Sequence, residues 1–167
     1  VWAKILKKNK GSKLILKSGS PRDSEVLYEK FRKYNISNSI HFKSRTESFE
    51  EHLNLYQEID LSLDTFPYNG VTTSFESLWM GVPVLTMKGF NFNSRCGESI
   101  NLNLELREFI ANDHEDYLNK SIKFQDNIKL SKLRSSLREK VLNSPLFDTY
   151  NFVKDLSEIF VKLMKKV

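Results

Sequence analysis

Residues 60–86 constrain the fold of this chain more than any other segment, because they predict four elements in a fixed order. They read D-L-S-L-D-T-F-P-Y-N-G-V-T-T-S-F-E-S-L-W-M-G-V-P-V-L-T. An apolar strand over residues 60–64 is followed by an Asn-Gly turn and by a helix over residues 72–80, which the sequence G-V-P ends. A second apolar strand follows over residues 82–87. This strand, helix and strand unit is typical of a parallel sheet.

The same alternation runs along the rest of the chain. Further strands are predicted over residues 13–17, 39–43 and 108–111. The predicted helices cover residues 2–8, segments that begin near Ser20 and Ser48, residues 93–103, residues 114–128 and a final helix with the apolar stripe Phe152, Leu156, Phe160, Leu163 and Val167. This order predicts an α/β fold in which helices cover both faces of a parallel sheet. We expect one domain over residues 1–167, with a helical segment from about residue 113 onward.

Two of the predicted helices begin with capping residues. Ser20 can accept a hydrogen bond from the first turn, and the charge of Asp23 favours a helix N-terminus. Pro21 suits the first helical position. Ser48 and Glu51 have the spacing of a capping box.

The charge balance favours a small acidic ligand over nucleic acid. The 26 Lys and Arg residues exceed the 21 Asp and Glu residues, and the formal net charge is +5. The basic residues are spread out, apart from small clusters at residues 4–10 and 162–166, and a scattered excess is typical of solvated helix faces. We therefore expect no nucleic-acid binding, and a diphosphate is the better match for the positive charge.

Cysteine content and hydropathy constrain the cellular compartment of the protein and its contact with membranes. The one cysteine, Cys96, excludes a disulfide within the chain and a cysteine-rich zinc site, and it suits a reducing compartment such as the cytoplasm. No apolar run approaches the roughly 20 residues of a membrane span, and no signal peptide is visible, so we expect no membrane contact. The chain begins at Val1 without a methionine and enters a predicted helix at once, so we expect it to be a fragment of a longer protein.

The turn and helix start after the strand at residues 60–64 have chemistry that suits a diphosphate. Asn69 and Gly70 favour a tight turn in which a positive φ costs little. Thr72 and Thr73 then stand at a helix N-terminus, where unpaired amides and the helix dipole attract negative charge. An acidic side chain one turn along the helix can accept hydrogen bonds from ribose hydroxyls.

A plain structural interpretation competes with this one. The sequence T-S-F-E has the spacing of a capping box, in which Glu76 would bond the backbone at the start of its own helix. On spacing alone, this capped strand-turn-helix connection is the simpler explanation of the segment.

The whole of residues 60–86 resembles the catalytic region of the O-linked N-acetylglucosamine transferases and their SPINDLY-like group. The pattern of that family is close to L-D-x-x-P-x-N-G-x-T-T, then an acidic residue, then L-W-x-G-x-P-V-x-T. The sequence W-A-K-I-L-K-K near the amino terminus, and S-R, E-F-I-A and S-P-L-F downstream, occur in the expected order. The resemblance covers nearly all of the chain.

This resemblance implies two Rossmann-like halves, the GT-B arrangement of glycosyltransferases, with the active site in the cleft between them. The chain would be the carboxyl-terminal half, which binds a UDP-sugar donor. Thr72 and Thr73 match the pair that contacts the diphosphate, and Glu76 matches the acidic ligand of the ribose. His52 matches a histidine near the uridine, although a solvated helix residue is the alternative.

Three further residues complete the predicted donor site. Asn69 and Gly70 shape the turn before the two threonines. Arg95 follows a loop at residues 89–93 that can fold over the donor. A surface arginine near a helix start is the equal alternative for Arg95.

The chain departs from the family pattern at several points. Val71 stands where animal members have a histidine, and Leu55 stands where an arginine is expected three residues after His52. A lysine that approaches the donor phosphates in the family would precede Val1. The acceptor-binding half, the family's proposed general base and any tetratricopeptide repeats are also absent, so we expect no catalytic residue in this chain and no transfer by it alone.

The same comparison favours inversion at the sugar. Retaining enzymes of this architecture have two glutamates separated by seven residues; Glu76 occupies the second place, but the first is Tyr68. No Asp-x-Asp motif is present, and His41, His52 and His114 lack metal-ligand spacing, so we expect neither a metal nor a cofactor. An acceptor hydroxyl would then attack the anomeric carbon from the face opposite to UDP, while the protein orients the donor.

The expected function is transfer of N-acetylglucosamine, or another hexose, from UDP to protein hydroxyls. Two alternatives stay open. Val71 and Leu55 favour a non-catalytic module that binds a nucleotide sugar or a partner protein, and a relative that uses UDP-glucose with asparagine as acceptor is the other. Hydrolysis by paired carboxylates is disfavoured, because Asp60 and Asp64 lie four residues apart along a predicted strand.

Overall fold

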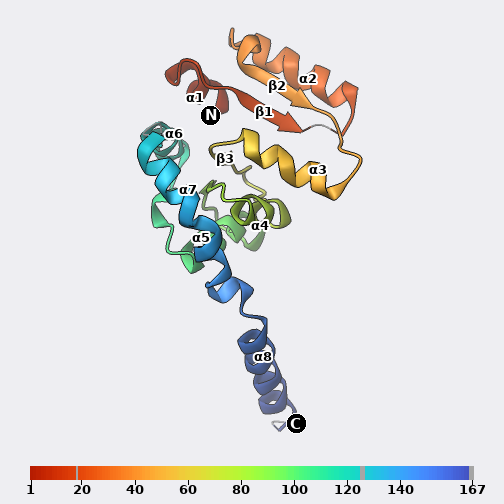
Figure 1. Cartoon of the computed structure of the whole chain (residues 1–167), viewed down its shortest axis with the longest axis vertical. Helices are drawn as coiled ribbons and strands as arrows, with labels where there is room; N and C mark the ends of the chain where they lie inside the picture. The colour runs from red at the N-terminus through yellow and green to blue at the C-terminus, as the bar shows by residue number, and fades with distance from the viewer. Residues whose placement is uncertain (18, 125–126, 166–167) are drawn as a thin grey trace.

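The computed structural model describes residues 1–17, 19–124 and 127–165 of the chain, which form an α/β fold (Figure 1). Every strand pair described is parallel. β1 (Leu14–Lys17) pairs with β2 (Ile40–Lys43), and β4 (Val84–Met87) lies between β3 (Ser62–Leu63) and β5 (Ile110–Ala111). Parallel neighbours require crossover connections, which the helices supply.

The helices alternate with these strands along the chain. The α-helices are α1 (Trp2–Lys8), α2 (Pro21–Arg32), α3 (Phe49–Asn54), α4 (Thr72–Trp79), α5 (Cys96–Asn103), α6 (His114–Lys123), α7 (Asn127–Leu142) and α8 (Thr149–Met164). The short 3₁₀ helices are η1 (Ser37–Ser39), η2 (Leu55–Glu58), η3 (Phe92–Ser94), η4 (Arg107–Phe109) and η5 (Pro145–Phe147). The predicted α/β order is confirmed.

β4 shows why helices lie on both faces of its sheet. Successive side chains of a strand point to opposite faces. Val84 is buried against residues of α4, α5 and α7, whereas Leu85 is buried against residues of α1 and α6. A parallel strand that is covered on both faces is a continuous apolar run, as residues 82–87 largely are. The prediction of helices on both faces is therefore confirmed.

α1 joins the two groups of strands. Leu6 packs in one core with Leu14 of β1 and Ile40 of β2. Its neighbour Ile5 packs in another core with Leu85 of β4. A single short helix thus belongs to both cores.

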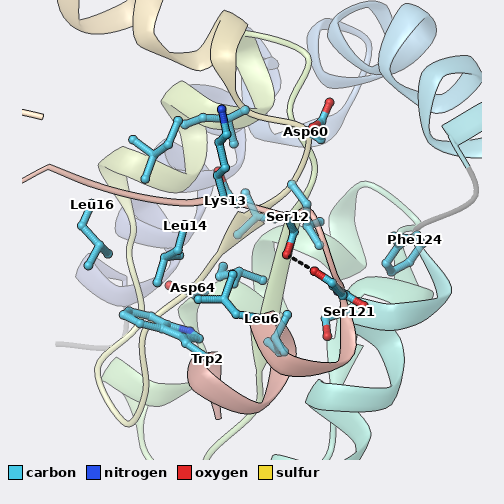
Figure 2. A pocket seen from close by; sticks show the side chains of 18 of the residues that line it. Trp2, Leu6, Ser12, Lys13, Leu14, Leu16, Asp60, Asp64, Ser121 and Phe124 are labelled. Carbon is cyan, nitrogen blue, oxygen red and sulfur yellow. Dashed lines mark hydrogen bonds between the residues drawn. The ribbon is translucent and has the colours of Figure 1, made fainter. Parts of the chain in front are cut away.

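The strands form two sheets rather than the single sheet predicted. β1 and β3 are not paired in the described part of the chain, and a cavity of about 950 Å³ lies between them. Figure 2 shows Trp2 and Leu6 of α1, Leu14 and Leu16 of β1, and Asp64 beyond β3 around this cavity. β3 is only two residues long, which leaves little edge for β1 to pair with.

The helix starts confirm one prediction of capping and correct another. Ser20 accepts a hydrogen bond from the amide of Asp23 at 3.2 Å, as predicted. Ser48 accepts one from the amide of Glu51 at 3.1 Å, but the Glu51 carboxylate accepts from the amide of Glu47 at 3.0 Å. The predicted capping box is only half formed, because the Glu47 amide takes the place of the Ser48 amide.

Two predicted helices have different bounds in the structure. Arg95, with φ −122° and ψ 1°, separates η3 from α5, so the helix predicted over residues 93–103 is divided. α6 ends before Phe124, whose ring stacks on Phe109 with centroids 4.0 Å apart. One helix over residues 114–128 was therefore a wrong prediction, although residues 125 and 126 lie outside the described residues.

α8 extends away from the rest of the chain (Figure 1). The apolar stripe predicted for it is exposed: Phe152 is 64% exposed, Leu156 37%, Phe160 57% and Leu163 55%. Val167, the last member of that stripe, lies outside the described residues. None of the helices described is long and apolar enough to cross a membrane.

Replacement of Phe109 tests the core beneath β4 and β5. Phe109 is 0% exposed, so Phe109→Ala should lower the free energy of unfolding by about 3–5 kcal/mol through lost burial and a residual cavity. Phe90, at 88% exposure, supplies the matched control, and Phe90→Ala should change that free energy by less than about 0.5 kcal/mol. Urea unfolding followed by circular dichroism measures both, and equal losses would contradict the assignment of the core.

Candidate functional site

The site is built around the start of α4, which follows β3. Val71 is the residue before the helix, and no side chain caps it. The first backbone bond of the helix runs from the Phe75 amide to the Val71 carbonyl at 3.0 Å. The described residues offer no partner to the amides of Thr72 and Thr73, and both side chains are exposed. This helix end is therefore open to an acceptor of hydrogen bonds, with the dipole favouring an anion.

Gly70 is required by space and not by backbone conformation. The predicted positive φ is wrong for Asn69 and Gly70, since neither residue has one. A Cβ on Gly70 would come within 2.6 Å of the Thr73 hydroxyl and 3.2 Å of the Ser74 hydroxyl. The Ser74 hydroxyl in turn donates to the Gly70 carbonyl at 3.0 Å. Glycine thus lets the loop lie directly against the first turn of α4.

Asp64, which follows β3, is buried and holds this loop in place. Its Oδ1 atom accepts hydrogen bonds from the amides of Thr65 at 2.9 Å and Gly70 at 2.7 Å. Its Oδ2 atom accepts one from the Thr86 hydroxyl of β4 at 2.6 Å. Burial raises the pKa of Asp64, while these hydrogen bonds act in the opposite direction. The carboxylate connects the ends of two neighbouring strands with the turn before α4.

Asn69 is buried in the same loop, at 1% exposure. Its side-chain nitrogen donates to the Thr65 carbonyl at 2.8 Å, and its Oδ1 atom accepts from the Gly97 amide at 3.4 Å. Its own amide donates to the Asn93 carbonyl at 3.0 Å. Asn69 therefore ties the loop after β3 to the start of α5, and direct contact between Asn69 and a donor stays a prediction.

Glu76 and His52 are brought together, as the predicted site requires. The His52 Nε2 atom lies 2.9 Å from Glu76 Oε2, and the Tyr56 hydroxyl donates to the same oxygen at 3.3 Å. The Tyr56 hydroxyl also lies 3.3 Å from the Thr73 carbonyl. Burial, and then the charge of Glu76, raise the pKa of Tyr56. The capping-box alternative for Glu76 is wrong, because its carboxylate faces α3 and η2 instead of the start of α4.

Lys17 completes this cluster from the end of β1. Its Nζ atom lies 2.8 Å from His52 Nδ1 and donates to the Thr46 hydroxyl at 3.0 Å. The cluster therefore contains one cationic side chain, one imidazole and one carboxylate. His52 is one of its members and not the isolated solvated residue of the alternative interpretation.

Arg95 stands apart from this cluster. Its Nε atom donates to Glu98 at 2.7 Å, and its side chain is 58% exposed. The described residues show no contact from Arg95 to Thr72, Thr73 or Glu76. Closure of Arg95 over a donor stays a prediction.

Sequence reasoning missed Lys17, Tyr56 and the role of Asp64. A signal existed for Tyr56, which follows His52 by four residues and so shares its helical face. A signal existed for Asp64 too, since it ends an apolar strand at the edge where ligands of parallel sheets bind. No sequence signal pointed to Lys17, because its hydrogen bond with His52 joins residues that lie 35 positions apart.

A model of glycosyl transferase family 41 matches residues 1–156 of the chain. The chain belongs to this family. This membership agrees with the resemblance in its central segment.

Two curated relatives share similar levels of identity with the chain. A probable UDP-N-acetylglucosamine–peptide N-acetylglucosaminyltransferase SPINDLY of Solanum lycopersicum is 32% identical over 174 residues, which are 99% of this chain and 18% of the relative. The protein of the same name in Eustoma exaltatum subsp. russellianum is 34% identical over 164 residues, which are 93% of this chain and 18% of the relative. The chain thus spans less than a fifth of the length of these relatives.

A solved structure agrees with this family 41 membership. A mutant of the Thermobaculum terrenum O-GlcNAc transferase superimposes with a TM-score of 0.88 at 30% sequence identity. The match covers 95% of this chain and 31% of that one. The Rossmann-like α/β fold is therefore shared with a part of that enzyme.

Removal of the Asp64 carboxylate tests its role in shaping the site. Asp64→Ala should lower the free energy of unfolding by about 1–3 kcal/mol, because it leaves the buried Thr86 hydroxyl and two part-buried amides without their acceptor. Asp60 is the matched control: its side chain is 86% exposed and pairs with Arg134 at 3.1 Å, so Asp60→Ala should cost less than about 1 kcal/mol. Chemical unfolding of the two variants measures this difference, and a larger loss for Asp60→Ala would refute the assignment.

Proposed function

We propose that this chain is the UDP-sugar-binding half of an inverting, metal-independent glycosyltransferase of family 41, which modifies Ser and Thr hydroxyls of proteins. The observation that carries the proposal is the open start of α4 beside the Glu76, His52 and Tyr56 cluster. The open helix start suits the charged diphosphate of a nucleoside diphosphate, and the cluster suits its polar nucleoside. The names of the two curated relatives support N-acetylglucosamine as the sugar and a peptide as the acceptor.

The diphosphate would lie on the first turn of α4. The amides of Thr72 and Thr73 and their hydroxyls can donate to phosphate oxygens, and the helix dipole adds a favourable field. Negative charge builds up on the leaving diphosphate as the sugar bond breaks. Donors that already point at it stabilise that charge without reorganisation.

The ribose would lie against Glu76. Oε2 of Glu76 already accepts from His52 and Tyr56, whereas the described residues give Oε1 no partner. A ribose hydroxyl can donate to this free oxygen. His52, whose ring lies 6.2 Å from the exposed ring of Phe49, would then stand near the uracil.

The proposed reaction is a single displacement. An acceptor hydroxyl attacks the anomeric carbon from the face opposite to UDP, which leaves with the electrons of the broken C–O bond. We assign no general base to this chain and place it, with the acceptor site, in the half of the enzyme outside this sequence. Tetratricopeptide repeats are a further proposed partner segment.

The second candidate function is a non-catalytic nucleotide-sugar or interaction module. Val71 favours it, because an apolar side chain that is 45% exposed stands at the mouth of the proposed phosphate site. Leu55 also offers no cation three residues after His52. A nucleotide-sugar module would differ from the enzyme in turnover and not in UDP binding.

UDP binding is the first test of the proposal. Calorimetric titration of the chain should show binding of UDP and much weaker binding of ADP. Glu76→Gln should weaken UDP binding by about 1.5–3 kcal/mol through loss of a charged acceptor, and Thr73→Val by about 0.5–1.5 kcal/mol. Glu139→Gln and Thr149→Val, at exposed positions of α7 and α8, are the matched controls.

A thermal melt gives an independent measure of the same binding. UDP at about 100 times its dissociation constant should stabilise the fold by about 2.7 kcal/mol. No binding at millimolar UDP, or equal effects of the site and control variants, would contradict the proposed site.

Turnover separates the enzyme from the module. The chain alone should release no UDP from UDP-N-acetylglucosamine in the presence of acceptor protein, whereas a protein extended to the length of its relatives should do so. Parallel assays with UDP-glucose identify the sugar. Transfer by the chain alone would show that the catalytic groups lie within it, and UDP binding without turnover by the longer protein would establish the module.

A further inference from the structure

We propose that Lys17 is a positioning residue of this site: it selects the tautomer of His52 and thereby fixes the orientation of the Glu76 carboxylate. The inference rests on the proposed function, because the ligand of Glu76 is the ribose of UDP. Its basis is a row of hydrogen bonds that joins β1, α3 and α4.

The chemistry of the groups sets the direction of these hydrogen bonds. A lysine ammonium donates and cannot accept, so His52 Nδ1, 2.8 Å from Lys17 Nζ, must accept. The proton of a neutral imidazole then stands on Nε2. From there it is donated to Glu76 Oε2, 2.9 Å away.

Each of the other protonation states of His52 loses at least one of these contacts. The opposite tautomer would turn an N–H toward the Lys17 ammonium and a lone pair toward the Glu76 carboxylate. A doubly protonated ring would keep the bond to Glu76 but would place two positive groups 2.8 Å apart. Of the two tautomers, Lys17 therefore favours the one with its proton on Nε2.

Lys17 is itself held in place. Its ammonium also donates to the Thr46 hydroxyl at 3.0 Å, in the loop before α3. Two acceptors from one short segment thus fix the Nζ atom at the end of β1. A mobile surface lysine could not impose a tautomer on its neighbour.

The carboxylate at the other end of the row gains a defined orientation. Glu76 Oε2 receives the His52 Nε2–H and the hydroxyl of Tyr56, which is 7% exposed. The Glu76 side chain is itself only 16% exposed. With Oε2 occupied, Oε1 is left for a ribose hydroxyl. Loss of Lys17 would let the His52 ring rotate. It would thereby weaken one of the two hydrogen bonds that hold the Glu76 carboxylate.

The tautomer of His52 can be measured directly in the chain without ligand. Nitrogen-15 NMR of the imidazole rings distinguishes a protonated ring nitrogen from an unprotonated one. The proposal expects His52 with its proton on Nε2 in the wild type and a mixture of states in Lys17→Met. Lys30→Met, at an exposed position of α2, should leave the His52 signals unchanged.

Binding of UDP analogues measures the consequence for Glu76. The wild type should prefer UDP over 2′-deoxy-UDP or 3′-deoxy-UDP by about tenfold, the value of one hydrogen bond to a charged group. This preference should fall to about twofold in Lys17→Met. In a double-mutant cycle, Lys17→Met should add little to the loss caused by Glu76→Gln, because both changes act on the same bond.

Each outcome of these experiments either supports or overturns the proposal. A changed His52 tautomer, a reduced preference for ribose hydroxyls and a non-additive cycle support the proposal. An unchanged tautomer overturns it. So does weaker UDP binding with the hydroxyl preference intact and full additivity, which would make Lys17 a direct phosphate contact. If the wild type binds no UDP, the proposed function fails, while the NMR comparison still decides whether Lys17 controls His52.

Discussion

The site depends first on the hydrogen bonds of one buried carboxylate. Asp64 accepts from the Gly70 amide and the Thr86 hydroxyl, and these bonds bring the turn before α4 against the end of β4. The start of α5 lies close to the same group, because a Cβ on Gly97 would overlap the Asp64 and Thr86 side chains. The position of the α4 N-terminus, and hence of Thr72 and Thr73, follows from this packing.

The two parts of the proposed donor site come from the two groups of strands. Lys17 is the last residue of β1 and His52 follows β2, whereas Thr73 and Glu76 follow β3. The His52–Glu76 contact connects these groups at the carboxyl ends of the strands, near a cavity whose lining includes Tyr56. A nucleotide that touches both His52 and the start of α4 would span the same division. Ligand binding and the joining of the two sheets are therefore expected to support each other.

Local patterns predicted much of the fold. The apolar run at β4, the glycine after α4 and the Ser20 cap are all set by residues close in sequence, and each has its expected structure. The division into two sheets was not predictable, because it depends on how little of β3 is strand. The end of α6 likewise depends on the stacking of Phe124 on Phe109, which is a tertiary contact.

The candidate site was likewise only partly predictable from the sequence. The threonines and Glu76 belong to one continuous segment, and spacing together with the family resemblance identified them. Lys17 and Asp64 act across long stretches of sequence: Lys17 meets His52, 35 residues later, and Asp64 meets Thr86, 22 residues later. Spacing within a motif contains no information on such pairs. Glycine at position 70 was predicted for the wrong reason, since crowding by the Thr73 hydroxyl and not φ excludes a side chain there.

The dual role of α1 has a consequence for the order in which the chain gains its structure. Leu6 can be buried once β1 and β2 exist, but Ile5 packs with Leu85 and with Tyr117 of α6, far along the chain. Contacts between residues so distant in sequence form slowly, because a long loop must close before they stabilise anything. During synthesis α1 emerges before α6, so one of its faces stays in contact with solvent until α6 has been synthesised.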